Sequence, residues 1–490
     1  MFETILKIDN CFSQLVTKDD VVKAFIWKRL RFPAKNYWHT RLYKQKLWDG
    51  YDNFFSKETG KFLTGLLPEV QLVLQGLKVK YTIEDVREQI NWRKKSIDDQ
   101  FMGYWLAEYN SNVPEDERRE KFVLRDFQPE LVNGVLKNGR AIVQAPTGAG
   151  KTMVLVSLIK LLPPNTPTLI LCHKKGVCDQ NWRELTNWGC KDIGRLYDKH
   201  HDVKMITCAC WQSSKHLEKL LPEIKVLIVD EAHKMTSKGP RRIYTKLKNC
   251  SVRVAISGTP FKFGETDKSQ KYMIKGYFGP RLKLKKEIAG ETGLLSAKML
   301  QDRGELSKSL CTFYPIKSPM LPYATFQDAV DQCIVNNWDF HKIVKRLADL
   351  KLKGRTMILV ERIDHGDYLQ NLIPGALWIH GEDNMKSRRI VIDKLRKAKG
   401  DVVAIATQGI FNEGIDVFIH NLVNAAGGKA DHDIIQRMGR GLRPADDKSI
   451  LNYIDFYFHV NDYLEEHSKK RIKILKKEGH EIVIKENIDF

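Results

Sequence analysis

The segment Ala141-Ile-Val-Gln-Ala-Pro-Thr-Gly-Ala-Gly-Lys-Thr152 leads from an apolar run into a helical pattern that spans Met153 to Leu162. A strand, a glycine-containing loop and a helix in this order are the context of a phosphate-binding loop. Gly148 and Gly150 allow successive backbone N–H groups to turn toward phosphate oxygens, and the helix N-terminus adds partial positive charge. The alternative, a chance glycine-rich turn, is less favoured because both flanking elements are present.

The end of this loop carries the chemistry. Lys151 is expected to reach the β- and γ-phosphates of a nucleotide, and the Thr152 hydroxyl is expected to ligate Mg²⁺. The residues predicted to bind the nucleotide here are Pro146, Thr147, Gly148, Ala149, Gly150, Lys151 and Thr152.

A second segment, Val226-Leu-Ile-Val-Asp-Glu-Ala-His233, places two carboxylates at the end of a buried strand, where ligands of a parallel sheet gather. Asp230 can hold Mg²⁺ through water, and Glu231 can orient and deprotonate the water that attacks the γ-phosphate. Taken alone, the pair would be better explained by Asp230 as a helix N-cap and Glu231 as a favourable first-turn charge. The loop upstream favours the catalytic interpretation.

A third segment, Ile434-Ile-Gln-Arg-Met-Gly-Arg-Gly-Leu-Arg443, puts Arg437, Arg440 and Arg443 three residues apart, on one face of a helix. Such a face needs an anion, which a nucleotide bound to another lobe can supply. Arg440 and Arg443 would then act as arginine fingers that stabilise charge on the transferring phosphoryl group. The alternative is a basic surface helix.

From about residue 140 onward, short apolar runs alternate with longer helical patterns, as is typical of strands buried on both faces of a parallel sheet. The predicted strands are 141–145, 168–172, 204–208, 225–230 and 253–257, and, after Pro315, Pro319 and Pro322, 356–360, 375–379, 402–406, 421–425 and 450–455. Two tandem α/β lobes are predicted. We expect a small α+β N-terminal domain that binds nucleic acid at 1–112, an ATP-binding lobe at 113–318, and a second lobe with a basic C-terminal helix at 319–490.

The composition points to a polyanion as partner. In 490 residues, 81 Lys and Arg stand against 60 Asp and Glu, a surplus of 21 positive charges. No stretch approaches the roughly 18 apolar residues needed to cross a bilayer, and the start lacks a secretory pattern, so a cytoplasmic protein is expected. The nine cysteines show no paired Cys-x-x-Cys spacing, so neither a disulfide framework nor a zinc site is indicated.

Seven basic residues and no acid lie between Lys28 and Lys46, interleaved with Phe32, Tyr37, Trp38 and Tyr43. Cations for phosphates and rings for exposed bases suit a nucleic-acid surface. The alternative is that the rings form a core and the cations solvate one face. The predicted nucleic-acid contacts are Lys28, Arg29, Arg31, Lys35 and Arg41. A second acid-free cluster, from Lys469 to Lys477, is expected on a C-terminal helix, either as a further nucleic-acid surface or as a solvated face.

Taken together and in this order, these segments resemble the motifs of superfamily 2 helicases and translocases, whose two RecA-like lobes bind ATP in the cleft between them. The resemblance spans residues 122 to about 460. It implies that Arg125 and Gln128 contact adenine, that Ser257-Gly-Thr-Pro260 links hydrolysis to movement, and that His233 and Gln436 bridge the lobes. Thr407, Gly414 and Asp416 match a further motif, from which Gly414 and Asp416 are expected at the nucleotide and Thr407 at nucleic acid. Segments that resemble backbone-gripping loops add Lys174, Lys175 and Thr207 as nucleic-acid candidates.

The likeness extends to the phage UvsW-type helicases, which remodel branched DNA, through Trp48-Asp-Gly50, Phe62-Leu-Thr-Gly-Leu66 and Tyr453-Ile-Asp455. It implies an enzyme that uses ATP and Mg²⁺ to unwind or branch-migrate forks and Holliday junctions in recombination, repair or replication restart. We expect it to act as a monomer on DNA, with recombination or replication proteins as further partners.

Two alternatives remain open. An RNA helicase would share every motor motif. A non-enzymatic nucleic-acid clamp is the alternative from another class, and the intact set of Lys151, Asp230, Glu231 and Arg440 argues against it.

Overall fold

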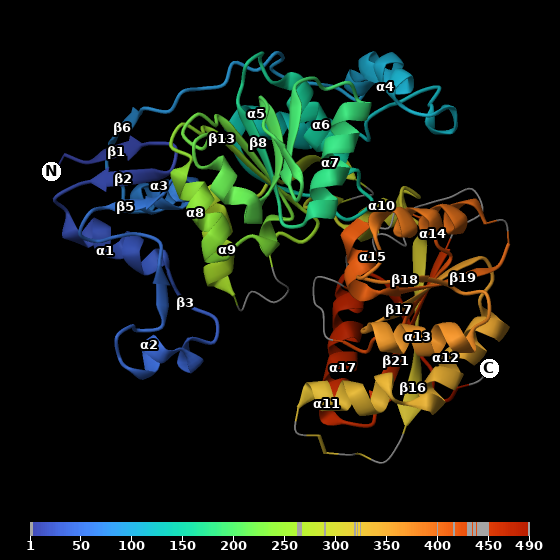
Figure 1. Ribbon diagram of the computed structural model, residues 1–490. Helices are drawn as coiled ribbons and strands as arrows, with labels where there is room; N and C mark the ends of the chain where they lie inside the picture. The colour runs from blue at the N-terminus through green and yellow to red at the C-terminus, as the bar shows by residue number, and fades with distance from the viewer. Residues whose placement is uncertain are drawn as a thin grey trace. The chain divides into compact units, whose positions relative to one another are not determined.

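The computed structural model describes residues 3–261, 267–288, 291–317, 320, 322–323, 325–398, 400–414, 417–428, 434, 438 and 450–488. The chain divides into two compact units (Figure 1). The first comprises residues 1–145, 150–288 and 292–295, and the second comprises residues 296–490 with the short segments 146–149 and 289–291. In the part of the chain that is described, no helix is both long and apolar enough to span a membrane.

The first unit begins with a small α+β domain. Its four-stranded sheet has the order β5-β2-β1-β6, formed by β1 (Ile5–Ile8), β2 (Phe12–Val16), β5 (Lys61–Leu63) and β6 (Thr82–Asp85). Helices α1 (Asp20–Arg29) and α3 (Leu67–Gly76) pack on this sheet through a core that includes Leu6, Ile26 and Leu74. The predicted α+β class of the N-terminal domain is confirmed.

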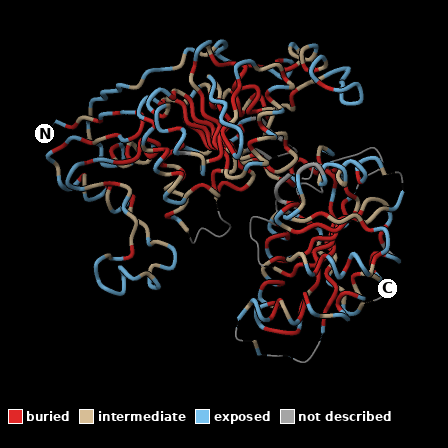
Figure 2. Tube along the Cα trace, in the orientation of Figure 1, coloured by how far each residue is buried: buried red, intermediate tan, exposed pale blue. Residues whose placement is uncertain are grey.

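A seven-stranded sheet forms the centre of the first unit, and its strands are mostly buried (Figure 2), except the exposed edge strand β10. In sheet order they are β10 (His200–Asp202), β9 (Ile193–Tyr197), β11 (Ile206–Cys210), β8 (Thr168–Cys172), β12 (Val226–Asp230), β13 (Val252–Ser257) and β7 (Arg140–Gln144). All neighbours pair in parallel except β10 with β9. The helices of this lobe are α4 (Leu106–Asn112), α5 (Phe127–Asn138), α6 (Lys151–Leu161), α7 (Lys175–Asn187), α8 (Lys238–Lys246) and α9 (Lys268–Phe278).

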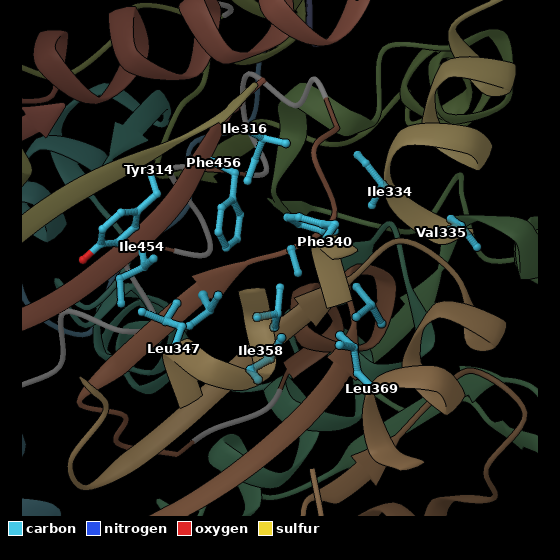
Figure 3. Close-up of a cluster of buried hydrophobic side chains, with 14 of the residues drawn as sticks. Tyr314, Ile316, Ile334, Val335, Phe340, Leu347, Ile358, Leu369, Ile454 and Phe456 are labelled. Carbon is cyan, nitrogen blue, oxygen red and sulfur yellow. The ribbon is translucent and has the colours of Figure 1, made fainter. Parts of the chain in front are cut away.

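The second unit has its own seven-stranded parallel sheet. Its order is β18 (Leu377–Ile379), β19 (Val402–Thr407), β17 (Arg355–Val360), β20 (Asn421–Asn424), β21 (Ile450–His459), β16 (Lys308–Lys317) and β22 (Glu481–Ile484). Among its described residues, the helices are α10 (Ala297–Asp302), α11 (Phe326–Val330), α12 (Trp338–Lys351), α13 (Ile363–Leu372), α14 (Met385–Lys397), α15 (Gln408–Gly414) and α17 (Asp462–Lys477). Strand residues such as Ile358 and Phe456 meet helix residues such as Phe340 and Leu369 in its core (Figure 3). Two further short strands, β14 (Leu284–Ile288) and β15 (Glu291–Gly293), pair with each other.

The predicted boundary between the lobes, after residue 318, is wrong. Strand β16 (Lys308–Lys317) pairs along its whole length with β21 and so belongs to the second sheet. The second unit therefore starts near residue 296.

The boundary at 112 is also not where the compact units divide, because residues beyond β6 pack on the first lobe. The backbone N–H of Arg93 donates to the Leu161 carbonyl (2.9 Å), and the Asn133 side chain bonds both backbone groups of Ile97.

Close contacts dock the N-terminal domain on the first lobe. A Cβ atom on Gly65, in the short 3₁₀ turn η2 (Thr64–Leu66), would lie 2.1 Å from the Lys275 carbonyl oxygen of α9. The Lys275 ammonium lies 2.9 Å from the Glu69 carboxylate of α3. On β7, the Arg140 guanidinium donates to the carbonyl oxygens of Asn10 and Tyr277. The domain is thus joined to the strand that leads into the phosphate-binding loop.

Replacing Gly65 by Ala should destabilise the first unit by about 1–3 kcal/mol, the typical cost of overpacking, because the opposing atoms are backbone and cannot move aside cheaply. Denaturant unfolding of the full chain measures this change. Gly76→Ala in the same domain is the matched control, since no atom lies within 4 Å of its added Cβ. Equal stability of the two variants would contradict the docking role of Gly65.

Candidate active site

The loop between β7 and α6 has the backbone shape that phosphate binding requires. Gly148 and Gly150 have φ values of 86° and 75°, in the left-handed region that favours glycine. The Ala149 N–H donates to the Pro146 carbonyl (3.1 Å), which closes the turn, and Lys151 begins α6. An eleven-residue helix therefore points its positive end at this loop.

Gln128 holds the end of the loop from the side. Its amide oxygen accepts the Arg125 backbone N–H (2.9 Å), and its amide nitrogen donates to the Gly150 carbonyl (3.3 Å). A Cβ atom on Gly150 would lie 2.4 Å from that nitrogen, so the contact requires glycine. Arg125 and Gln128 therefore lie beside the loop, and their predicted contact with adenine stays a prediction.

Lys151, the first residue of α6, forms an ion pair with Glu231, which directly follows β12. The Lys151 ammonium lies 2.7 Å from Glu231 Oε1, and both side chains are largely shielded from water. Burial opposes ionisation of Glu231, but Lys151, His233 and Ser257 outweigh it and hold the pKa of Glu231 well below its usual range. Glu231 has φ 52°, a rare conformation for a residue with a side chain and one that is found at functional sites.

Asp230 is the last residue of β12 and directly precedes Glu231. Burial and the adjacent Glu231 charge raise the pKa of Asp230 above its ordinary value. The Asn181 amide of α7 donates to Asp230 Oδ2 (3.2 Å) and lies 3.5 Å from Cys172 Sγ. No sequence pattern singled out Asn181, because its partner lies 49 residues away.

Ser257, at the end of β13, joins three groups of the site. Its hydroxyl donates to Glu231 Oε2 (3.0 Å), accepts the Thr259 N–H (3.2 Å) and lies 2.8 Å from His233 Nδ1. Strand β13 lies between β12 and β7 in the sheet. Ser257 therefore connects the carboxylate segment to the Ser257–Pro260 motif.

The comparisons with known proteins agree with this geometry. Residues 121–262 match the family described as the res subunit of type III restriction enzymes, and residues 339–445 match the helicase conserved C-terminal domain. The chain belongs to the superfamily 2 helicases. These are enzymes that hydrolyse ATP.

Individual relatives include two named DNA enzymes. The ATP-dependent DNA helicase uvsW of Enterobacteria phage T4 is 24% identical over 73% of this chain and 76% of its own. The DNA 3'-5' translocase XPB2 of Sulfurisphaera tokodaii is 25% identical over 68% of this chain and 81% of its own. Among solved structures, Dbp5 of S. cerevisiae bound to RNA and ADP BeF3 has a TM-score of 0.51 and 18% identity, covering 73% of this chain and 89% of that one. That likeness shows the two-lobed helicase fold alone.

The helicase motifs of the second lobe are described only in part. Gly414 ends α15, and Thr407 ends β19 with its side chain largely buried. Asp416, Gln436, Arg437, Arg440 and Arg443 lie outside the described residues. The arginine-finger assignment therefore stays a prediction.

Some of the predicted nucleic-acid contacts are exposed, and others bond to partners within the protein. Lys28, Lys35 and Arg41 are exposed, and so is Arg29, although its guanidinium lies 3.6 Å from Glu69. The Arg31 guanidinium pairs with Asp49 (2.5 Å) and lies 3.9 Å from the centre of the Tyr51 ring, and its contact with nucleic acid stays a prediction.

The backbone-gripping candidates of the first lobe divide in the same way. The prediction for Thr207 is wrong, because its side chain is 3% exposed and bonds both backbone groups of Lys204. Lys174 caps α7 at its N-terminus, and the exposed Lys175 lies 2.8 Å from Asp198.

Replacing Glu231 by Gln should leave ATP binding intact and slow hydrolysis by about 100-fold or more, because the amide cannot take a proton from water. Nucleotide binding and single-turnover hydrolysis measured side by side test this expectation. Glu218→Gln, which changes an exposed carboxylate of the same unit, is the control. Unchanged turnover in the Glu231 variant would remove this residue from the role of base.

Proposed function

We propose that this helicase is an ATP-driven DNA translocase that unwinds or branch-migrates branched DNA, such as forks and Holliday junctions, in recombination, repair or replication restart. The observation that carries the proposal is a bonded set in which Lys151, at the start of α6, meets Glu231, Ser257 and His233 near the ends of β12 and β13. The names of two relatives, a phage DNA helicase and an archaeal DNA translocase, support DNA as the substrate.

The residues of the first lobe suit ATP hydrolysis. Lys151 would exchange its bond to Glu231 for the γ-phosphate, which releases Glu231 to orient and deprotonate the attacking water. Thr152 and Asp230 offer the oxygen ligands that Mg²⁺ prefers, and the ion would neutralise charge on the phosphates. Gln436, Arg440 and Arg443 would complete the site from the second lobe as switch residue and arginine fingers.

Hydrolysis is linked to movement through Ser257 in this proposal. Any shift of Glu231 that accompanies exchange of its Lys151 partner is transmitted through the Ser257 hydroxyl to His233 and to the Thr259 backbone. The Thr259 backbone is thus linked to Lys151 through three successive bonds, Lys151–Glu231, Glu231–Ser257 and Ser257–Thr259.

The main test compares substrates at one stated salt concentration. ATPase activity and unwinding are measured on a fork, a four-way junction, a plain DNA duplex and an RNA duplex of the same sequence. We expect the branched DNAs to stimulate most, and Lys151→Ala to abolish both activities on every substrate. Full unwinding by the Lys151 variant would refute the motor, and stronger stimulation by RNA would favour an RNA helicase.

The exposed cations of the N-terminal domain should contribute sequence-independent affinity. In the double variant Lys35→Gln, Arg41→Gln, the slope of log affinity against log salt should fall by about 1.5 to 2, because two phosphate contacts are lost. Lys95→Gln with Lys137→Gln, which removes two exposed charges from the same unit, is the matched control. An equal change of slope in both double variants would show that only net charge matters.

A further inference from the structure

The N-terminal domain carries a protruding arm, residues 31–53. It consists of β3 (Arg31–Pro33), the 3₁₀ turn η1 (Tyr37–His39), the single helical turn α2 (Arg41–Lys44) and β4 (Tyr51–Asn53), with β3 and β4 paired antiparallel. Figure 1 shows α2 at the end of this extension, away from the N-terminal sheet, and Figure 2 shows the tip as mostly exposed.

The root of the arm is held firmly. Arg31 pairs with Asp49 and lies over the ring of Tyr51, so the two strands are joined by charge and by stacking. The Phe32 ring stacks on Tyr272 of α9 at 4.2 Å between ring centres, and the Ser269 hydroxyl of α9 donates to Asp52. The arm is therefore fixed to the first lobe at its base.

The aromatic rings of the tip pack on one another, while other apolar side chains extend into solvent. Tyr37 packs edge-on against Trp38 and Tyr43, with ring centres 5.2 and 4.7 Å apart, and a Cβ atom on Gly50 would lie 2.4 Å from the Tyr37 ring. The outer side chains of Trp38, Leu42 and Leu47 are 51%, 55% and 72% exposed. Three such residues on one short tip are more than the scattered exposure normal for a surface.

Cations surround these apolar side chains. Lys35, Arg41, Lys44 and Lys46 are exposed, and no acidic residue occurs from Val21 to Trp48. Within the described part of the chain, none of these four makes an ion pair. A second copy of this chain is a poor partner, because it would bring the same positive charge to the contact. Another protein is also a poor partner, because the centres of protein interfaces are depleted in Lys. Exposed bases flanked by phosphates match both the rings and the charge.

We propose that the arm tip is a wedge for the branch point of DNA, on which Trp38 stacks against the exposed base or terminal base pair while the surrounding cations hold the phosphates. This inference rests on the proposed function and assigns the recognition of the branch to three apolar residues rather than to the charge of the whole domain. Trp38 offers a flat face to any base, so the contact is tolerant of sequence.

The experiment measures binding of the full chain without ATP, at one salt concentration, to two DNAs. One is a fork with 2-aminopurine at the branch, and the other is a relaxed, covalently closed circular duplex, which has neither unpaired bases nor a terminal base pair. Trp38→Ala should weaken fork binding about tenfold, as expected for loss of one stacking contact, and reduce the 2-aminopurine response. Affinity for the closed duplex should change less than about twofold, and Trp38→Phe should restore most of the fork affinity.

Trp338→Ala is the matched control, because Trp338 is 52% exposed on α12 of the second unit, away from the arm's sequence. Unchanged fork affinity in Trp38→Ala would overturn the wedge and favour a protein partner for the tip. Equal losses on the fork and on the closed duplex would also overturn it. If forks stimulate the wild-type ATPase but Trp38→Ala binds them normally, only the wedge fails. If no DNA stimulates the ATPase, the proposed function fails, and the binding data still decide on the wedge.

Discussion

The ion pair between Lys151 and Glu231 is the interaction on which the chemistry of the first unit depends. Two opposite charges are held 2.7 Å apart where little water reaches them, an arrangement that is costly unless further bonds compensate. The Ser257 hydroxyl supplies one such bond, and the strained backbone of Glu231 aims its carboxylate at Lys151. The parallel order of β12, β13 and β7 makes this possible, since it brings three carboxyl ends to one edge of the sheet.

Much of the fold followed from the sequence because strands buried on both faces read as continuous apolar runs. Strand β8 was predicted at its observed bounds, Thr168–Cys172, and the other predicted runs overlap observed strands. Strand β16 was missed, because Pro315 interrupts its pattern and proline removes a donor. The structure tolerates Pro315 because β22 pairs with Leu310–Phe313, and no other described strand pairs with β16 on that side at Pro315.

The candidate site was predictable where function depends on local spacing and unpredictable where it depends on contacts distant in sequence. The glycines of the loop and the Asp230-Glu231 pair are contiguous signals. Asn181 gives no such signal. The number of basic residues between Lys28 and Lys46 does not show that Arg31 differs from the other cations of this segment. Only the fold shows that Arg31 pairs with Asp49 inside the arm, while Lys35 and Arg41 stay exposed.

The C-terminal helix changes the assignment of the positive surplus. Arg471, part of the acid-free cluster in the sequence, is buried and pairs with the buried Asp455 at 2.8 and 3.0 Å. It also donates to the carbonyl oxygens of Gly427 and Gly428, which precede the segment that holds Arg440 and Arg443.

The neighbours of Arg471 also form ion pairs within the helix, because Lys469 and Lys470 pair with acidic residues one turn earlier in α17. This helix therefore has fewer cations available for DNA than its sequence indicated. The exposed cations of the arm are then the stronger candidates for the contact surface. The arm and β7, the strand that leads into the phosphate-binding loop, belong to one compact unit. Both contact α9, the arm through the stacking of Phe32 on Tyr272 and β7 through the bond from Arg140 to the Tyr277 carbonyl. A branch held at Trp38 would consequently be anchored to the same unit that contributes Lys151 and Glu231 to catalysis.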